Sequence, residues 1–331
     1  MLKKRIMSKI ENKKFFISGG AGFIGANFIR RIIQKNKVIV YDNLSRNSIK
    51  NTEFFTHPNL EVIKGDILNF EHLYDSIPES IDYILHMAAI AGIDNVIKNP
   101  VKTMEVNLVG TYNILKAIKE KSVISKIKRF ICFSTSEVFG IRAFKVSEKS
   151  STNLQPVGEA RWTYSVSKLA AEHLTYSYYK QFGLKAVIIR PFNIYGPGQV
   201  GEGAIHQFVV RAIKNEPLLI HGDGDQIRSW CYIDDIVDCL FLILEKKETI
   251  GETFNVGNPK GTITILNLAE KIIHIANSKS KIVHIPKNYV DIELRIPEIE
   301  KAKKILGYNP KIDSNKGLVK TIEWYREKIL K

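Results

Sequence analysis

The sequence has little cysteine and no long hydrophobic run. Only Cys132, Cys231 and Cys239 occur in 331 residues, which is too few and too widely spaced for a disulfide framework or a cysteine-ligated zinc site. Even the most apolar stretch, 236–244, is interrupted by Asp238 and is much shorter than the ~20 residues that span a bilayer. These absences exclude a disulfide-rich secreted scaffold and a membrane-spanning protein.

A secretory signal and a metal-binding motif are also missing. The first fourteen residues, MLKKRIMSKIENKK, are basic but lack the apolar core of about 7–15 residues that a signal peptide contains. We therefore expect a cytoplasmic protein in which residues 1–13 form a flexible overhang. None of the eight histidines lies in an H-E-x-x-H or clustered Cys/His pattern, so we expect no metal site.

Positive charge is in excess, since 49 Lys and Arg residues stand against 34 Asp and Glu residues, a net charge of +15. The lysines are scattered from Lys3 to Lys331 instead of forming one dense block. Scattered charge favours a Lys-rich surface over a nucleic-acid interface, although an anionic substrate also fits. We expect neither a nucleic-acid partner nor a membrane partner.

Short β-rich runs alternate with helical patterns over the first 190 residues. This alternation predicts the α/β class, with a doubly wound parallel (Rossmann) sheet covered by helices on both faces. The predicted strands are 15–18, 38–41, 61–63, 83–86, 129–134 and 186–190, and the clearest helices are 23–33, 101–121 and 164–181.

The local amino-acid composition changes after Pro191. Gly- and Pro-rich loops, NIYGPGQVGEG and HGDGDQ, separate shorter elements there. The chain closes with a predicted helix stop at Gly307 and a last amphipathic helix over 317–329. We predict a smaller C-terminal α/β substrate lobe over 191–331, from which some segments return to the first domain.

A glycine-rich turn follows the first predicted strand. Gly19, Gly22 and Gly25 lie in ISGGAGFIG between a strand and a helix, where backbone N–H groups and the helix N-terminus can bind a diphosphate. The second strand ends at Asp42, whose carboxylate can accept hydrogen bonds from ribose hydroxyls and repels a 2′-phosphate. The pattern predicts NAD rather than NADP, although Arg46 lies only four residues further on.

Later strand ends extend this predicted site. Asp66 follows the third strand, and Ala88 and Ala89 follow the fourth, where small side chains allow a cofactor to approach closely. The complete set of predicted cofactor-binding residues is Gly19, Gly22, Phe23, Ile24, Gly25, Asp42, Asn43, Asp66, Ile67, Ala88, Ala89, Tyr164 and Lys168.

Tyr164 and Lys168 are four residues apart and therefore share one helix face. A nearby ammonium group lowers a tyrosine pKa from its ordinary value of about 10, so that the phenol becomes a usable general base. The hydroxyl groups in Ser134-Thr135-Ser136-Glu137, at the end of the 129–134 strand, can reach the same reacting oxygen. We therefore expect Tyr164, Lys168 and these hydroxyl groups to lie together as the catalytic residues.

Together these motifs resemble the extended short-chain dehydrogenases/reductases, the NAD-dependent epimerase/dehydratase family that modifies nucleotide sugars. The resemblance covers nearly the whole chain, in family order, through GGAGFIG, STSEVFG, YSVSK, RPFNIYGPG, GDGDQIRSWCYIDD, FNVGNP and RIPEIEKAKKILGYNPK. It implies a tightly held NAD that oxidises the sugar at C4, followed by chemistry on the keto-sugar and usually by return of the hydride. It also implies that 1–190 binds NAD and that 191–331 mainly binds a nucleotide-diphosphate sugar, with UDP-sugars favoured.

The resemblance also implies a role for individual residues. Tyr164 takes the proton of the C4 hydroxyl, Lys168 assists it and holds the nicotinamide ribose, and Thr135 hydrogen-bonds the reacting oxygen. Asn193 and Arg228 contact the diphosphate of the sugar nucleotide. Arg228 suits this role on chemical grounds, because a guanidinium fork matches phosphate oxygens.

The reaction after C4 oxidation depends on Ser136 and Glu137. Simple 4-epimerases of the family usually lack an acid at the position of Glu137, and 4,6-dehydratases carry Asp where Ser136 stands. Thr-Ser-Glu, together with Arg161-Trp162 and Arg295-Ile296-Pro297, looks most like UDP-glucuronate decarboxylases. That implies that Glu137 and Arg295 flank the C6 carboxylate and C5, with Ser136 alongside. A C4 ketone would stabilise the enolate left when carbon dioxide departs.

Other interpretations stay open at this point. Thr-Ser-Glu also occurs in GDP-mannose-type dehydratases, so a 4,6-dehydratase or a 4-epimerase of UDP-glucose or UDP-N-acetylglucosamine remains possible. A different class, a non-catalytic NAD- or nucleic-acid-binding protein, could dispense with Tyr164 and Lys168, and this chain retains both. The resemblance further implies a homodimer formed by the 101–121 and 164–181 helices, with Val109, Tyr112, Leu174 and Tyr178 at the seam.

Overall fold

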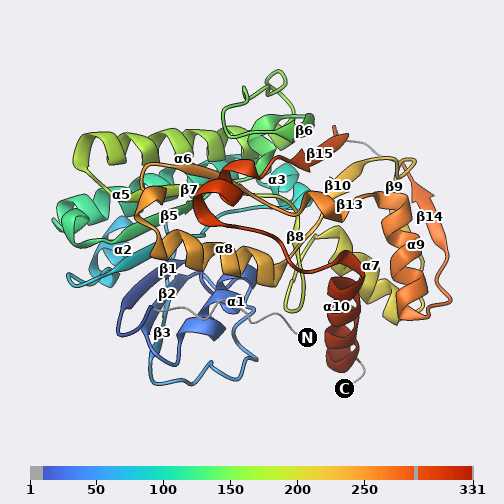
Figure 1. Cartoon of the computed structure of the whole chain (residues 1–331), viewed down its shortest axis with the longest axis horizontal. Helices are drawn as coiled ribbons and strands as arrows, with labels where there is room; N and C mark the ends of the chain where they lie inside the picture. Colours follow the sequence, from blue (N-terminus) through green and yellow to red (C-terminus); the bar gives the residue numbers. More distant parts are fainter. Residues whose placement is uncertain (1–9, 287–289, 330–331) are drawn as a thin grey trace.

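A seven-stranded parallel sheet forms the centre of the computed structural model, which describes residues 10–286 and 290–329 (Figure 1). The strand order is β12-β7-β5-β4-β1-β2-β3, so the chain winds outward from β1 in one direction and from β4 in the other. The predicted doubly wound Rossmann sheet is confirmed. Its strands are β1 (Lys14–Ser18), β2 (Lys37–Asp42), β3 (Leu60–Lys64), β4 (Tyr83–His86), β5 (Arg129–Phe133), β7 (Ala186–Pro191) and β12 (Thr253–Val256).

Helices cover both faces of this sheet, which explains why β4 and β5 are buried along their whole length. In Figure 1, α2, α5 and α6 lie on one side of the sheet, and α1 and α8 lie on the other. The helices of this part are α1 (Phe23–Ile32), α2 (Phe70–Ser76), α3 (Ile93–Lys98), α4 (Pro100–Met104), α5 (Gly110–Glu120), α6 (Ala160–Phe182) and α8 (Ile233–Glu245), with short turns η2 (Ile124–Lys126), η3 (Ser136–Phe139) and η4 (Lys247–Thr249).

The helix predicted over 101–121 contains a π-helical turn, η1 (Glu105–Val109), between α4 and α5. Asn107 of this turn is buried, and its side chain accepts a hydrogen bond from Ile90 N at 2.8 Å and donates one to Ile90 O at 3.1 Å. Such single π turns often lie at functional sites. Here the turn holds the loop that follows β4.

The smaller lobe is built on a four-stranded sheet of order β13-β10-β15-β6 and a β14-β9 pair. The two layers exchange segments across residue 190, because β6 joins the smaller lobe while β12 and α8 join the Rossmann layer. The remaining elements are β6 (Arg142–Val146), β8 (Ile194–Tyr195), α7 (Ala204–Ile213), β9 (Leu218–His221), β10 (Ile227–Ser229), β11 (Cys231–Tyr232), η5 (Pro259–Gly261), β13 (Thr262–Thr264), α9 (Ile265–Ala276), β14 (Ile282–Ile285), β15 (Leu294–Pro297), η6 (Ala302–Leu306) and α10 (Ser314–Ile329).

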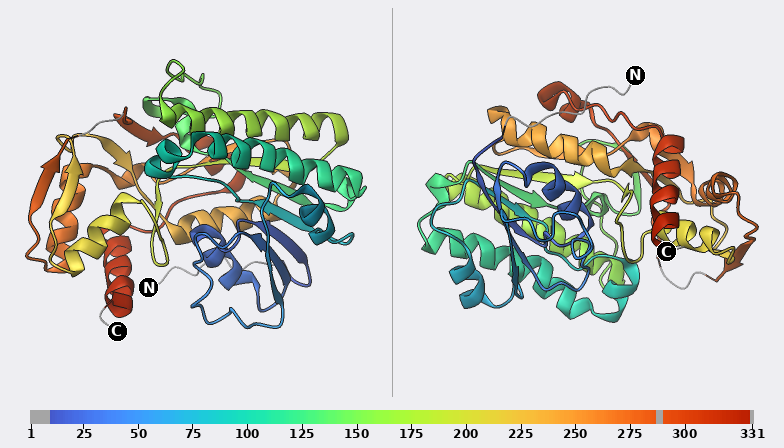
Figure 2. Two further views of the ribbon diagram at one scale, coloured as in Figure 1. Left: turned by 180° about the vertical axis from the view of Figure 1, so that it is seen from behind. Right: turned by 90° about the horizontal axis from the view of Figure 1, so that it is seen from below.

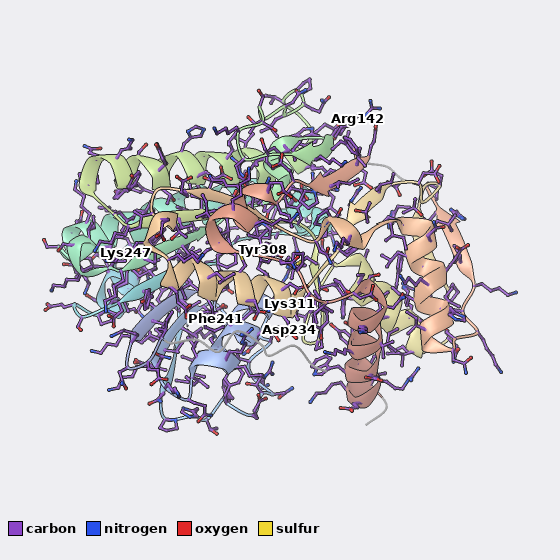
Figure 3. The ribbon with its side chains drawn as sticks, in the orientation of Figure 1. Arg142, Asp234, Phe241, Lys247, Tyr308 and Lys311 are labelled. Atoms are coloured by element: carbon purple, nitrogen blue, oxygen red, sulfur yellow. The ribbon has the colours of Figure 1, made fainter. Side chains whose placement is uncertain are left out.

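The C-terminal segment is tied to α8 by charge. Gly307 ends η6 with φ +69°, as the predicted helix stop requires. Beyond it, Lys311 donates its backbone N–H to Asp235 at 2.8 Å, and its Nζ lies 3.7 Å from Asp238. Arg31 of α1 pairs with the same Asp238 at 2.6 Å. Figure 3 shows Lys311 beside the start of α8, so this cluster joins α1, α8 and the C-terminal segment.

A buried ion pair fixes α6 against the sheet. Arg190 of β7 donates to both oxygens of Glu172 in α6, at 2.9 Å from Nε and 2.7 Å from Nη2. Ser134, which follows β5, donates to Glu172 as well. Glu172 lies one turn after Lys168 and two turns after Tyr164. The bidentate pair therefore fixes the position of α6 along its axis and the direction of the helix face that carries Tyr164 and Lys168.

Within residues 10–286 and 290–329, no helix has the length and apolar character needed to cross a bilayer.

Candidate active site

Two cavities meet at the carboxyl ends of the parallel strands, the edge at which open α/β sheets bind ligands. The first, of about 500 Å³, follows the ends of β1 to β5, and the second, of about 670 Å³, lies against the smaller lobe. They are adjacent because both are lined by Arg46, Tyr164, Asn193, Ile194, Gln199 and Val200.

The glycine turn forms the floor of the first cavity. Gly19 has φ +72°, and a Cβ at this position would lie 2.4 Å from Ala88 N, so only glycine fits between β1 and β4. A Cβ on Gly25 would lie 2.4 Å from Gly20 O, where α1 packs on the turn. Gly22 is the N-cap of α1, which directs the helix N-terminus to this cavity. The turn therefore fits the diphosphate of a dinucleotide.

Asp42 lies at the end of β2 beside this turn. Its carboxylate accepts hydrogen bonds from Ala21 N at 3.0 Å and Leu44 N at 2.7 Å. Burial raises the pKa of Asp42, and the two backbone hydrogen bonds oppose that rise. Arg46 reaches across to the loop after β4, where Nη2 donates to Ala91 O at 2.8 Å. This arrangement favours ribose hydroxyls over a 2′-phosphate at Asp42.

Every cofactor-binding residue predicted from the sequence lines the first cavity. Their individual contacts with a cofactor stay a prediction, but the structure brings the whole set together: Gly19, Gly22, Phe23, Ile24, Gly25, Asp42, Asn43, Asp66, Ile67, Ala88, Ala89, Tyr164 and Lys168.

Tyr164 lies where the two cavities meet. It shares a side-chain hydrogen bond with Thr135, whose Oγ1 also accepts from Glu137 N at 3.2 Å. Burial raises the pKa of Tyr164 well above its ordinary value, and the Glu137 carboxylate raises it further. The hydrogen bond from Thr135 and the positive charges of Arg295 and Arg46 lower the pKa of Tyr164. The phenol oxygen is therefore held by Thr135 and lies near the positive charges of Arg295 and Arg46.

Lys168 lies one turn after Tyr164 and is only 2% exposed. Burial lowers the pKa of Lys168, while Cys132 and Glu172 oppose that change. From the sequence we expected Lys168 to lower the pKa of Tyr164. In the structure this lowering is not found: burial raises the pKa of Tyr164, and the positive charges that oppose the rise are those of Arg295 and Arg46.

Three arginines and two carboxylates form a network in the second cavity. Arg161 Nη1 lies 3.2 Å from both oxygens of Glu137, and Arg161 Nη2 donates to Asp291 at 3.1 Å. Arg228 donates to the same Asp291 oxygen at 3.2 Å. Arg295 Nη1 lies 3.5 Å from Glu137. With three positive and two negative groups, the network keeps an excess of positive charge, which suits an anionic ligand.

Arg295 is the most enclosed member of this network, at 2% exposure. Its Nη2 donates to Gly140 O at 3.1 Å, and its buried Nε has no hydrogen-bond partner among the described residues. Burial lowers the pKa of Arg295 to about 9, and the Glu137 carboxylate raises it. A buried N–H donor without a partner is costly. The Arg295 side chain also lines the second cavity, so it can present its positive charge to a ligand there.

The remaining predicted residues, Asn193, Arg228 and Ser136, differ in whether they line a cavity. Asn193 lines both cavities with φ +37°, and its Nδ2 donates to Ser229 O at 3.1 Å. Arg228 lines the second cavity, as a diphosphate contact should. Ser136 is buried beside Thr135 and is not among the residues that line either cavity, and its proposed role stays a prediction.

Asp291, and the ion pairs that Arg161 forms with Glu137 and Asp291, were not predicted from the sequence. Asp291 lies between two strands in a segment without periodicity, so no local signal identified it. In the described part of the chain, no group of three or more His, Cys, Asp or Glu side chains is placed to hold a metal ion.

The family model described as "NAD dependent epimerase/dehydratase family" matches residues 15–257. UDP-glucuronic acid decarboxylase 3 of Arabidopsis thaliana is 34% identical over 93% of this chain and 87% of that protein. The UDP-N-acetyl-alpha-D-glucosaminuronate decarboxylase of Bacillus cytotoxicus is 32% identical over 95% of this chain and 98% of that protein.

Solved structures agree with this match. The crystal structure of UDP-glucuronic acid 4-epimerase from Bacillus cereus, in complex with UDP-glucuronic acid and NAD, superposes with a TM-score of 0.83. It is 29% identical and covers 95% of this chain and 99% of that one.

Replacing Asp42 tests how the cofactor is selected. Asp42→Ala should weaken NAD binding by about 10-fold or more, the scale of a hydrogen bond to a charged group, and should narrow the advantage of NAD over NADP. Calorimetric titration with both dinucleotides measures this change. Asp75→Ala, which removes an exposed carboxylate on α2, is the control. An unaltered preference for NAD in Asp42→Ala would contradict the assignment.

Removing the phenol oxygen of Tyr164 tests the general base. Tyr164→Phe should leave folding and sugar-nucleotide binding nearly intact, while turnover falls at least about 100-fold. Tyr176→Phe changes an exposed tyrosine of the same helix and should be neutral. Steady-state rates, together with thermal unfolding, separate the two variants. Normal turnover by Tyr164→Phe would mean that another group is the base.

Proposed function

The chain belongs to the NAD-dependent epimerase/dehydratase family, and from this membership we propose that it is a UDP-glucuronate decarboxylase that acts through a C4-keto sugar. It is an enzyme, and its cofactor is NAD. The observation that carries the specific reaction is the positive cluster of Arg161, Arg228 and Arg295 in the second cavity, close to Tyr164. UDP-glucuronate is anionic at two places, its diphosphate and its C6 carboxylate.

The residues at the junction of the cavities perform the first step. Tyr164 removes the proton of the C4 hydroxyl, and Thr135 holds the same oxygen through its hydroxyl. NAD held in the first cavity would supply the acceptor for the C4 hydride and, in its reduced form, the donor that restores it. The glycine turn, Asp42 and the strand ends hold the dinucleotide so that only one face of the sugar can react.

The carboxylate is then lost from the position next to C5. Because the C4 ketone is β to the C6 carboxylate, it accepts the electron pair left by the departing carbon dioxide. Arg295 is proposed to hold that carboxylate through its guanidinium group, since this side chain lines the second cavity. Glu137 holds Arg295 and Arg161 in place by ion pairs, so it orients the guanidinium groups around C5 and C6.

A 4-epimerase acting on UDP-glucuronate is the second candidate, because the Bacillus cereus epimerase with that ligand has the same fold. Glu137 favours decarboxylation, since inversion at C4 requires no further acid or base. A 4,6-dehydratase has less support because Ser136 replaces its acid. The mass of the product distinguishes the three, since decarboxylation removes carbon dioxide, dehydration removes water and epimerisation removes nothing.

We also propose the cytoplasm as the location and a homodimer as the assembly. All three cysteines are free and buried, which fits a reducing compartment. The η1–α5 and α6 helices run side by side on an outer face (Figure 2) and expose Val109, Tyr112, Val166 and Tyr176 there. Tyr178, by contrast, packs inside its own chain against Phe182 and is not available to the seam.

Replacing Arg295 tests the reaction. Arg295→Ala should abolish carbon dioxide release from UDP-glucuronate, because the carboxylate loses its buried charged partner. Glu137→Gln should slow a step after C4 oxidation and let NADH absorbance accumulate. Mass spectrometry of the products and headspace carbon dioxide measure both variants.

Arg142→Ala is the matched control, since this arginine lies at the outer edge of the small lobe and pairs with Glu293 (Figure 3). It should keep wild-type activity. Thermal unfolding shows whether Arg295→Ala remains folded, and Arg295→Lys retains the charge if it does not. Carbon dioxide release at the wild-type rate by folded Arg295→Ala would exclude the proposed role.

The assembly is tested by light scattering at micromolar concentration. We expect about twice the 37.7 kDa chain mass for the unmodified protein. Val109→Asp combined with Tyr112→Asp should shift it to the monomer, because charge is costly in an apolar seam. Phe144→Asp, which alters an exposed apolar residue on β6, should not. A monomeric unmodified protein would rule out the dimer.

A further inference from the structure

Arg46 is the one charged side chain that lines both cavities, within residues 10–286 and 290–329. It belongs to the loop after β2, yet its guanidinium donates to Ala91 O at 2.8 Å in the loop after β4. Gly201, with φ +95°, packs against it from a third loop, where a Cβ would lie 3.4 Å from Arg46 Cζ. The guanidinium is therefore held at the junction of the cavities by backbone from two other loops.

Glu202 is a loose partner of this guanidinium. Arg46 Nη2 lies 3.9 Å from Glu202 Oε1, which is beyond hydrogen-bond distance. Glu202 is already engaged, because it accepts from Asp94 N at 3.0 Å, from Asn95 N at 3.2 Å and from Asn95 Nδ2 at 2.5 Å. The Arg46 side chain is 39% exposed. It can accordingly take a second carboxylate without breaking a tight ion pair.

The position of Arg46 relative to Tyr164 indicates which part of a sugar nucleotide it would meet. Arg46 and Arg295 line the second cavity together with Tyr164, the residue assigned to the C4 hydroxyl. In a hexuronate, C6 is attached to C5, the neighbour of C4, whereas the diphosphate is attached to C1 on the opposite side of the ring. Arg228 and Asn193 are the residues assigned to that diphosphate.

We propose that Arg46 is a specificity-determining residue that contacts the C6 carboxylate of the substrate from the cofactor side, opposite Arg295. Ala91 and Glu202 position its guanidinium for this contact. The inference rests on the proposed function, since it requires a substrate with a carboxylate at C6. It goes beyond that function by assigning the preference for a uronate over a neutral hexose to Arg46 in the loop after β2.

The test compares two ligands that differ only at C6, UDP-glucuronate and UDP-glucose. Dissociation constants are measured calorimetrically with NAD-loaded protein in the Tyr164→Phe background, where turnover does not consume the ligand. Arg46→Gln should weaken UDP-glucuronate by about 10–100-fold and UDP-glucose by less than about 2-fold, since only the former loses a charged partner. Arg46→Lys should recover part of the loss, because it keeps the charge without the guanidinium fork.

Arg142→Gln is the control, because Arg142 lines neither cavity and pairs with Glu293 at the edge of the smaller lobe. It should not change the preference between the two ligands. Equal weakening of both ligands by Arg46→Gln would place Arg46 on the diphosphate and overturn the inference. An undiminished preference for UDP-glucuronate would overturn it as well.

The same measurements distinguish a wrong substrate class from a wrong role for Arg46. If the protein with Arg46 intact does not prefer UDP-glucuronate over UDP-glucose, the proposed function and the inference both fall. If it does prefer UDP-glucuronate and Arg46→Gln retains that preference, the inference alone falls. Affinity for NAD, measured in the same variants, shows that the first cavity has kept its shape.

Discussion

The ion pairs around Arg161 join the two layers of the molecule at the place where the substrate would lie. Arg161 on α6 bridges Glu137, which follows β5, and Asp291, which precedes β15. Asp291 in turn holds Arg228 of β10. The second cavity and its charge therefore depend on this network, because its members come from both the Rossmann layer and the smaller lobe. Among the described residues this network has more arginines than carboxylates, which favours the binding of an anion beside it.

The cofactor half of the site could be predicted because its signals are local. Gly19, Gly22 and Asp42 belong to one strand–turn–helix–strand unit, in which sequence order and spatial order coincide. Tyr164 and Lys168 share a helix face by simple spacing. The same spacing would have identified Glu172, one turn further on, although only the structure shows that Arg190 and Ser134 bind it.

The substrate half could be predicted only through family resemblance, since its contacts join distant segments. Arg46 meets Ala91 and faces Glu202, and no periodicity links these three positions. For the same reason the predicted lowering of the Tyr164 pKa is wrong, because tertiary packing buries the phenol, which raises its pKa, and brings Arg46 and Arg295 to it only as opposing charges. The π turn at 105–109 likewise has no sequence signal, as it reflects how Asn107 is buried against the loop after β4.

On the proposed function, this site removes carbon dioxide from a C4-keto uronate, and C5 of the resulting enolate then takes up a proton. The most direct measurement is the reaction of UDP-glucuronate in deuterium oxide, followed by mass spectrometry and NMR of the nucleotide sugar. We expect a UDP-pentose that has lost the carboxylate and carries one solvent deuterium at C5. A product that retains the carboxylate and has no deuterium at C5 would contradict it and would identify the reaction as inversion at C4.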